Sequence, residues 1–247
     1  MRRDVITIRA KPTAINIDPG KSVVIVVDMQ NDFAAKRGLF DHAGVDISGA
    51  REAIPRIQTV LAASRRAGIP VVYLKMGFQP DLSDLGAEDS VNRIRHLQFG
   101  VGQAAQTPDD RTGRFLIRDT WNTDIVPELE PQPKDVVIYK TRFSGFYETE
   151  LDARLKQMGA KYLIFTGVTT CICVDSTLRD AMFRDYLCVL LGDCMSEPIG
   201  NELTRSNHEA SLLAVEAVFG WVSDSSEFVS ALRSNQSLQP TAGRSDV

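Results

Sequence analysis

The feature that most constrains the fold is a series of short apolar runs, rich in β-branched residues, that recur along the chain. The first of them, KSVVIVVD at residues 21–28, is apolar at consecutive positions rather than at alternate ones. A run that is apolar on both faces is typical of a central parallel strand covered by helices on each side. Five segments share this character and are predicted strands: residues 21–28, 69–76, 134–140, 161–167 and 187–193.

Amphipathic segments separate these runs. Between residues 51 and 70, apolar side chains recur at helical spacing, and Gly68 and Pro70 stand where a helix would end. Similar patterns predict further helices at residues 148–160, 173–186 and 205–220, with a short capped one at 222–233. Strands that alternate with helices predict one α/β domain of the doubly wound, Rossmann-like kind, a parallel sheet between two layers of helices.

Three segments fall outside this alternation. Residues 1–19 hold two prolines and no helical period, which predicts an extended lead-in. Residues 77–115 are polar and too long for a plain connection, so we expect a functional loop that contains some helix. Residues 234–247 are polar and poor in apolar side chains, which predicts a disordered C-terminal tail. The folded domain is therefore expected to span residues 1–233.

Composition narrows the classes of partner. The 247 residues include 28 Lys and Arg against 32 Asp and Glu, a net charge of −4 that argues against nucleic acid or an anionic membrane surface. The longest apolar runs are strand-sized and too short to span a membrane, and residues 1–12 lack the apolar core of a signal peptide. Four cysteines between positions 171 and 194 make no disulfide framework. We expect a soluble, cytoplasmic protein with free thiols.

Three predicted strands end in residues that can do chemistry: Asp28, Lys140, and the segment that leads from Gly167 to Cys173. Ligands bind doubly wound sheets beyond the carboxyl ends of the strands, so neighbouring strands would bring these groups together. Cys173 is expected in the first turn of a helix, which favours a thiolate, and Lys140 would lower the thiol pKa further. Asp28 could take the thiol proton and return it to a leaving amine. These roles predict acyl transfer at a carbonyl, most simply amide hydrolysis.

Each of these residues also has a purely structural interpretation. A strand-end aspartate often caps a turn, a strand-end lysine is usually solvated, and a buried cysteine is most often a small hydrophobe, as expected for Cys188 and Cys194. Cys171 and Cys173 lack a second cysteine pair, and the three histidines show no ligand spacing, so no metal site is predicted. A disulfide between these two would close a very small, strained loop. Only the three placements together favour catalysis.

Three motifs resemble the isochorismatase-like cysteine hydrolases: VVIVVDMQNDF at 23–33, IYKTRFSGFYET at 138–149 and FTGVTTCICVDSTLRDA at 165–181. The resemblance runs from about residue 14 to residue 233. It implies that Asp28, Lys140 and Cys173 form the family's catalytic triad, and that Cys171 occupies a variable position. It also implies a six-stranded parallel sheet and a homo-oligomer, either a dimer or a tetramer.

The resemblance implies further details of the site. The family has a non-proline cis peptide, which here would join Val168 and Thr169, and an oxyanion hole made by the backbone N–H groups of Thr169 and Cys173. Nicotinamidases of the family carry an Asp-x-His metal motif, whereas here Asp46 is followed two residues on by Ser48. The resemblance therefore implies neither a metal site nor a cofactor.

The remaining branches of the family are ureido and amide hydrolases that act on small molecules. Residues 128–146, 173–186 and 217–224 resemble most closely the ureidoacrylate amidohydrolases of pyrimidine breakdown, whereas residues 77–114 depart from that pattern. Biuret hydrolase and N-carbamoyl amino acid amidohydrolase remain alternatives. So do a metal-dependent nicotinamidase and a catalytically silent binding subunit, although a silent subunit has no use for an intact triad.

Residues near the three motifs are candidates for substrate contacts. The predicted substrate-binding residues are Gln30, Asn31, Phe33, Trp121, Asn122, Phe146 and Tyr147. Phe143 and Ser144 follow Lys140 and could equally be core or turn residues. Arg95 or Arg142 could pair with a substrate carboxylate, because a guanidinium group suits bidentate capture.

Overall fold

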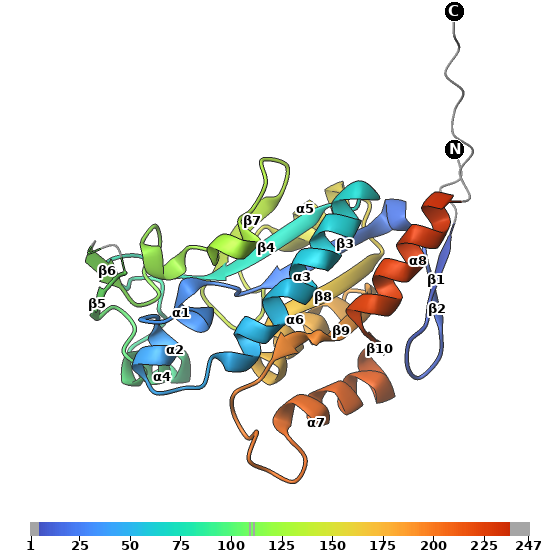
Figure 1. Cartoon of the computed structure of the whole chain (residues 1–247). Helices are drawn as coiled ribbons and strands as arrows, with labels where there is room; N and C mark the ends of the chain where they lie inside the picture. The colour runs from blue at the N-terminus through green and yellow to red at the C-terminus, as the bar shows by residue number, and fades with distance from the viewer. Residues whose placement is uncertain (1–4, 109, 111, 238–247) are drawn as a thin grey trace, which may run out of the picture.

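The computed structural model describes residues 5–108, 110 and 112–237. Its centre is a six-stranded parallel sheet with the strand order β10-β9-β8-β3-β4-β7 (Figure 1). The strands are β3 (Ser22–Val27), β4 (Val71–Met76), β7 (Val136–Lys140), β8 (Tyr162–Val168), β9 (Leu187–Ser196) and β10 (Trp221–Ser223). The prediction of a doubly wound α/β domain around a six-stranded parallel sheet is confirmed.

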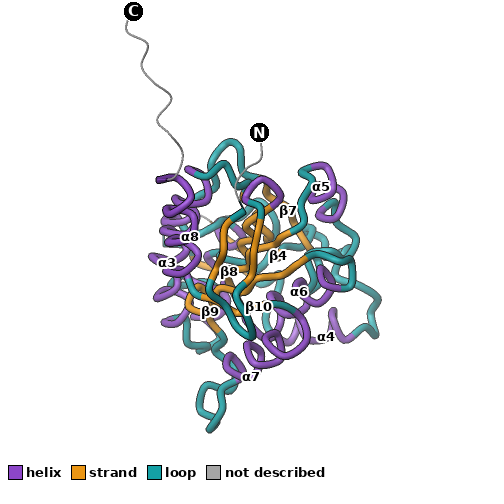
Figure 2. The backbone as a smooth tube through the Cα atoms, turned by 90° about the vertical axis from the view of Figure 1, so that its right-hand side faces the viewer, coloured by secondary structure: helices purple, strands orange, loops and turns teal. Residues whose placement is uncertain are grey.

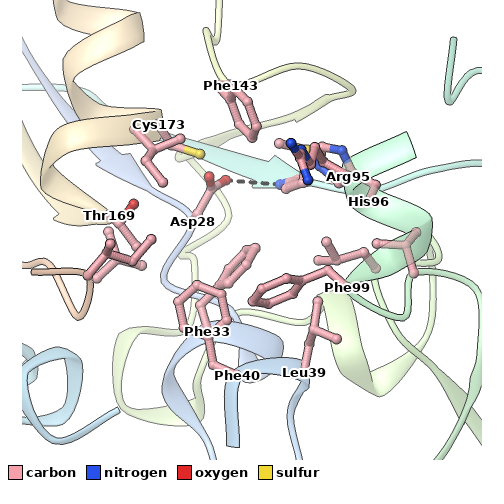
Figure 3. A pocket seen from close by; sticks show the side chains of 16 residues that line it. Asp28, Phe33, Leu39, Phe40, Arg95, His96, Phe99, Phe143, Thr169 and Cys173 are labelled. Carbon is pink, nitrogen blue, oxygen red and sulfur yellow. Dashed lines mark hydrogen bonds between the residues drawn. The ribbon is translucent and has the colours of Figure 1, made fainter. Parts of the chain in front are cut away.

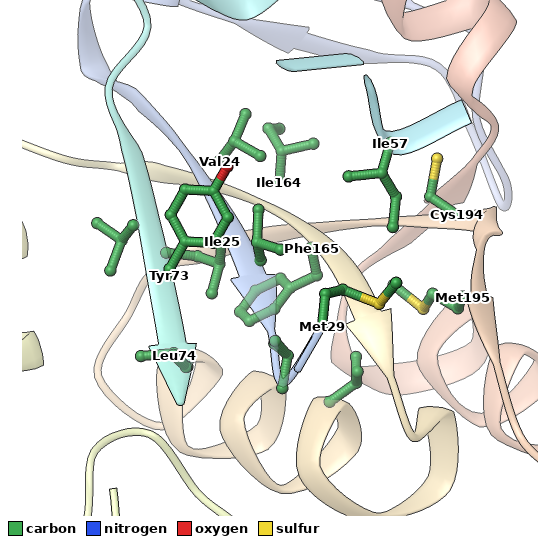
Figure 4. Packing of buried hydrophobic residues seen from close by; sticks show 14 of the residues in the cluster. Val24, Ile25, Met29, Ile57, Tyr73, Leu74, Ile164, Phe165, Cys194 and Met195 are labelled. Atoms are coloured by element: carbon green, nitrogen blue, oxygen red, sulfur yellow. The ribbon is translucent and has the colours of Figure 1, made fainter. Parts of the chain in front are cut away.

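The central strands are buried because both faces of the sheet are covered. Every residue of β3 and β4 is buried, as the consecutive apolar residues predicted. Side chains alternate between the two faces of the sheet: Figure 4 shows Val24 and Ile164 on the side of Ile57 from helix α3 (Ser48–Arg66), and Phe165 on the opposite side. Packing of this kind fixes the relative positions of the strand ends, on which the site depends.

Helices form a layer on each side of the sheet. Figure 2 shows α3 (Ser48–Arg66) and α8 (Ser225–Ser237) on one side of the strands, and α5 (Leu151–Gln157) and α6 (Asp175–Met182) on the other. Helix α3 packs against both α8 and β9. The further helix α7 (Asn207–Ala214) begins with a capping box between Ser206 and Glu209 and continues into a π-helical turn at Val215–Phe219.

The last part of the chain differs from expectation. Strand β10 begins at Trp221 and takes up the first two residues of the segment predicted to be a short helix, residues 222–233, and it pairs in parallel with β9. Helix α8 runs to Ser237, so residues 234–237 of the predicted tail are helical, and residues 238–247 lie outside the described part. The lead-in contains a small antiparallel pair, β1 (Ile6–Ile8) and β2 (Ile15–Ile17).

Short elements rather than long helices cover the carboxyl ends of β3, β4 and β7. They comprise α1 (Asn31–Ala34), α2 (Leu39–His42), α4 (Val91–Gln98), β5 (Ala104–Gln106), β6 (Thr112–Arg114), and 3-10 turns at Trp121–Thr123 and Pro127–Leu129. The helix expected within residues 77–115 is thus present as α4. Among the described residues, no helix is long and apolar enough to cross a membrane.

Candidate active site

The site lies where the strand order reverses. Strands β3 and β8 are neighbours, but the chain leaves β3 toward β4 on one side and leaves β8 toward β9 on the other. Their carboxyl ends meet in register, with Val27 opposite Gly167. Asp28 follows β3 directly, and Cys173 lies in a π-helical turn, Thr170–Val174, that follows β8. A crevice at such a reversal is the usual ligand site of a doubly wound sheet.

Lys140 reaches the same point from a strand that is not adjacent. It is the last residue of β7, and β4 lies between β7 and β3. Its side chain is fully buried, and Nζ lies 2.7 Å from Oδ2 of Asp28. The three groups were expected to meet only if their strands were neighbours. Lys140 nevertheless reaches Asp28 across β4, because its side chain is long.

Asp28 is held in a strained but well-defined position. Its φ of 50° lies in the left-handed region, which non-glycine residues rarely adopt and which is common at functional sites. Its Oδ1 accepts a hydrogen bond from the backbone N–H of Met76 at 3.0 Å, the dashed line in Figure 3. With Lys140 on the other oxygen, both oxygens of this buried carboxylate have a partner.

Cys173 is buried, and its thiol lies close enough to Asp28 and Lys140 for both to affect its pKa. Burial raises the pKa of the Cys173 thiol, Lys140 lowers it, and the Asp28 carboxylate raises it again. Burial lowers the pKa of Lys140, but Asp28 and Cys173 together bring it above its ordinary value. Lys140 thus lowers the pKa of the thiol as expected, but burial outweighs it, so the net shift of the Cys173 pKa is upward rather than toward a thiolate. The thiol lies beside the Lys140–Asp28 ion pair.

The turn that presents Cys173 is fixed by its surroundings. Gly167 has a φ of 112°, and a Cβ there would lie 2.1 Å from the carbonyl oxygen of Val27, so only glycine fits where β8 approaches β3. The buried Glu197 accepts a hydrogen bond from the backbone N–H of Cys171 at 2.9 Å. The hydroxyl of Thr177 donates to the carbonyl of Cys173 at 2.7 Å. The expected cis peptide between Val168 and Thr169 is present.

A cavity of about 170 Å³ opens onto Asp28 and Cys173. Its lining is apolar except for these two residues, Thr169, Arg95 and His96. The rings of Phe33 and Phe40 meet edge to face with centroids 4.9 Å apart, and Phe99 lies 6.0 Å from Phe40. Across the cavity in Figure 3 lie His96 and Phe143, whose rings stack at 5.6 Å. The cavity therefore joins a polar catalytic end to two largely aromatic walls.

Of the seven predicted substrate-binding residues, Phe33 alone is among those that line the cavity. The Gln30 amide donates to the backbone of Met76 and Thr123. Asn31 donates to the carbonyl of Trp121. These side chains tie the segment after β3 to the segment near residue 121. They support the site without facing it.

The other predicted contacts also lie apart from the cavity lining. Asn122 donates to Asp32 at 2.7 Å, Phe146 stacks against Tyr186, and Tyr147 lies against the Arg142 guanidinium. Arg142 itself donates to the carbonyl of Asp84, whereas Arg95 does line the cavity. Of the two arginines proposed to bind a carboxylate, the structure places only Arg95 at the cavity.

Sequence reasoning missed Asp32, which holds three segments together. Its carboxylate accepts hydrogen bonds from the backbone N–H groups of Leu39 and Leu116 and from Asn122. Burial raises its pKa to about 7, although the three hydrogen bonds lower it. The sequence shows that Asp32 stands four residues after Asp28. It does not show the hydrogen bonds of Asp32, because the three partners lie up to 90 residues away along the chain.

Within the described residues, no group of three or more His, Cys, Asp or Glu side chains is placed to hold a metal ion. Asp46, which marks the nicotinamidase motif, accepts hydrogen bonds from the backbone N–H and hydroxyl of Ser48. All four cysteines are free, including the half-buried Cys171, which lies in the same turn as Cys173.

The fold and this site define the class of protein. The family profile described as the isochorismatase domain matches residues 22–227, which include Asp28, Lys140 and Cys173. The chain therefore belongs to the isochorismatase family.

Similarity to individual proteins is more specific. Two curated relatives, the ureidoacrylate amidohydrolases RutB of Methylobacterium radiotolerans and of Methylorubrum extorquens, are each 39% identical to this chain. The first alignment covers 94% of this chain and 87% of the relative, and the second 95% and 92%.

Solved structures agree with this assignment. A cysteine hydrolase from Pseudomonas syringae is similar with a TM-score of 0.75 and 26% identity over 95% of this chain and 100% of its own. An N-carbamoylsarcosine amidase from Thermoplasma acidophilum is similar with a TM-score of 0.61 and 25% identity over 83% of this chain and 96% of its own.

Proposed function

We propose that this protein is an amidohydrolase that cleaves the terminal C–N bond of a small ureido compound of the ureidoacrylate type and releases ammonia. The observation that carries the proposal is the convergence of Asp28, Lys140 and Cys173 at one end of a cavity that Asp28 and Cys173 line. The 39% identity to ureidoacrylate amidohydrolases over nearly the whole chain supports the substrate class.

The first half of the reaction forms a thioester. Because the thiol is neutral at rest, its proton passes to Asp28 as the sulfur attacks the ureido carbonyl. The backbone N–H groups of Thr169 and Cys173 are the proposed donors to the oxyanion. Asp28 then gives the proton to the leaving nitrogen, the C–N bond breaks, and ammonia departs. A carbamoyl thioester remains on Cys173.

The second half regenerates the thiol. Asp28, again a carboxylate, removes a proton from a water molecule that attacks the thioester carbonyl. The C–S bond breaks, the sulfur regains a proton, and a carbamate leaves, which decomposes to carbon dioxide and the free amine. Lys140 remains an ammonium throughout and compensates the negative charge as it passes between Asp28 and Cys173, which a buried site requires.

The cavity is consistent with the chemistry of such a substrate. Arg95 lies at the cavity wall and is exposed, so it can bind a substrate carboxylate while the ureido group reaches Cys173. The apolar walls between these ends suit a short, conjugated linker.

The test is ammonium release from 3-ureidoacrylate, biuret, an N-carbamoyl amino acid and nicotinamide. We expect release from a ureido compound, and a loss of at least about 10⁴-fold in Cys173→Ala, since removal of a nucleophile abolishes the covalent route. Cys171→Ala is the matched control, because its thiol lies two residues away, and its activity is expected to stay within about threefold of wild type. Equal activity of Cys173→Ala and wild type would refute the mechanism, and release from nicotinamide alone would refute the substrate class.

A further inference from the structure

His96 is a buried polar residue in an otherwise apolar cavity wall. It lies on α4, within the segment 77–114 that departs from the ureidoacrylate amidohydrolase pattern, and only 8% of its surface is exposed. Its ring stacks on Phe143 and meets Phe78 edge to face at 5.1 Å. Contacts on two sides fix the plane of the ring, and the mechanism proposed above gives it no role.

One hydrogen bond determines which ring nitrogen carries the proton. Nδ1 of His96 lies 2.7 Å from the carbonyl oxygen of Asn92, and a carbonyl oxygen can only accept. Nδ1 therefore donates. Burial lowers the pKa of His96, as do the charges of Lys140 and Arg142, so the ring is neutral near pH 7. In a neutral ring with the proton on Nδ1, Nε2 is an acceptor.

Nε2 has no hydrogen-bond partner among the described residues, yet it is not one of their fully buried unpaired polar atoms, so it opens to the cavity that His96 lines. The stacked Phe143 beside it can donate nothing. When a ligand displaces water from the cavity, this acceptor is left unsatisfied unless the ligand supplies a donor. A well-placed polar group in an apolar pocket is also the usual device that fixes the orientation of a small ligand.

The position of His96 indicates which part of a ligand it meets. His96 lines the same cavity as Asp28 and Cys173, and the charge of Lys140 lowers the pKa of its ring. Arg95, the preceding residue, is exposed and lies at the wall in the same region of Figure 3. A donor that meets His96 is therefore near the carbonyl under attack, between that carbonyl and the end of the substrate that Arg95 binds.

We infer that His96 is a specificity-determining residue whose Nε2 accepts a hydrogen bond from the internal N–H of a ureido substrate. The inference rests on the proposed function and specifies it further. A ureido group carries this N–H between the scissile carbonyl and the rest of the molecule, whereas a plain carboxamide has a carbon there. A carboxamide leaves Nε2 unpaired in the apolar wall, and His96 thereby selects ureides over amides of the same shape.

The test compares two isosteres, 3-ureidoacrylate and the monoamide of glutaconic acid, in which a CH₂ group replaces the internal N–H. For each variant the ratio of kcat/KM for the two substrates is measured, so that their intrinsic reactivities cancel when ratios are compared. His96→Phe keeps a ring against Phe143 but removes the acceptor, and we expect the preference for the ureide to fall about tenfold. His96→Gln, which offers a carbonyl oxygen, is expected to restore part of the preference.

Binding provides an independent readout. In the Cys173→Ala background, calorimetry measures the dissociation constants of both isosteres with and without His96→Phe, so a result is obtained even if turnover fails. Loss of turnover by the wild type with a His96-dependent ratio of dissociation constants would refute the proposed function and support the inference. A His96→Phe variant that weakens both isosteres equally, or neither, would overturn the inference, as would a protein that binds neither.

Discussion

Two regions of the site differ in where their residues come from: the polar floor, made by Asp28, Lys140 and Cys173, and the aromatic walls of the cavity, which include Phe99 and Phe143. Asp28 and Lys140 come from strand ends and are each 1% exposed, and Cys173 follows a third strand. Phe99 and Phe143 come from irregular segments and are 44% and 40% exposed. The floor holds charges whose strength depends on exclusion of water, so it requires the packed sheet. The walls contact a ligand through apolar surface. Residues in these short surface elements can therefore be substituted without disturbing the buried charges of Asp28 and Lys140.

The largest effect is expected at the floor. Lys140→Met leaves the Asp28 carboxylate buried without its cation, so we expect kcat/KM to fall at least about 10³-fold. The free energy of unfolding should fall by about 3–5 kcal/mol, the usual cost of breaking a buried ion pair. Enzyme assays and urea denaturation measure the two effects.

Lys75→Met is the control for this substitution. Lys75 lies on β4, is nearly as buried, and approaches Asp124 no closer than 3.9 Å, outside the triad. Its variant should keep activity within a few-fold of the wild type. If both variants lost activity equally, the charge of Lys140 would have no special role, and the distinction between floor and walls would fail.

A second prediction concerns Asp32, which follows Asp28 by four residues and accepts hydrogen bonds from the segments of Leu39 and Leu116, two residues of the cavity lining. The pKa of Asp32 is raised to about 7 in the folded protein, so between about pH 4 and 7 the folded chain binds a proton that the unfolded chain has released. Stability from this group is present below that range and is lost as the pH rises through 7. Between pH 5 and 8 we expect the free energy of unfolding of the wild type to fall by roughly 2 kcal/mol relative to Asp32→Asn.

Urea denaturation at four pH values measures this difference. Asp41 is the control because its pKa is lowered, chiefly by Lys36, so its contribution to stability has the opposite sign and is lost as the pH falls. Parallel pH profiles of the wild type and Asp32→Asn would contradict this prediction, because they would show that the three hydrogen bonds fully offset the effect of burial on the pKa of Asp32.

The smallest effect is expected at the walls. Phe99→Ala removes part of one wall, and we expect KM for the ureido substrate to rise about tenfold, with kcat nearly unchanged, since uniform binding is lost. Phe183 is also an exposed phenylalanine but is not among the residues that line the cavity, so Phe183→Ala should leave both constants unchanged. A large fall in kcat for Phe99→Ala would contradict this prediction, because it would mean that Phe99 contributes to the chemical step and not only to substrate binding.

The same division explains what the sequence could predict. Strands β3, β4, β7, β8 and β9 were recognisable because buried parallel strands are apolar at consecutive positions, whereas β10 has only three residues, all half-buried. The convergence of Asp28, Lys140 and Cys173 was predictable because each residue stands at or just beyond a strand end. The charge state of Cys173 was not, since the pKa of its thiol depends on burial that no local pattern reveals.

The walls were largely unpredictable for a physical reason. Phe40 and Phe99 meet at 6.0 Å although they are 59 positions apart, and neither stands in a periodic segment that would mark it. Gln30 and Asn31 suggested pocket residues because they are polar and close to Asp28. Their amides instead satisfy backbone groups of the covering segments. Proximity in sequence to a catalytic residue says little about which way a side chain faces.

The place of Lys140 on β7 has a consequence for how the molecule ages and fails. Strand β7 is the outermost strand on its side of the sheet and is paired only with β4. Peripheral strands are the first to fray, whereas β3 and β8 in the middle are the last. Lys140 is therefore carried by an edge strand, whereas Asp28 and Cys173 follow strands in the middle of the sheet. Local opening of this edge would separate Lys140 from Asp28 while the centre of the sheet stays folded, so activity is expected to fall before spectroscopic measures of the whole fold change.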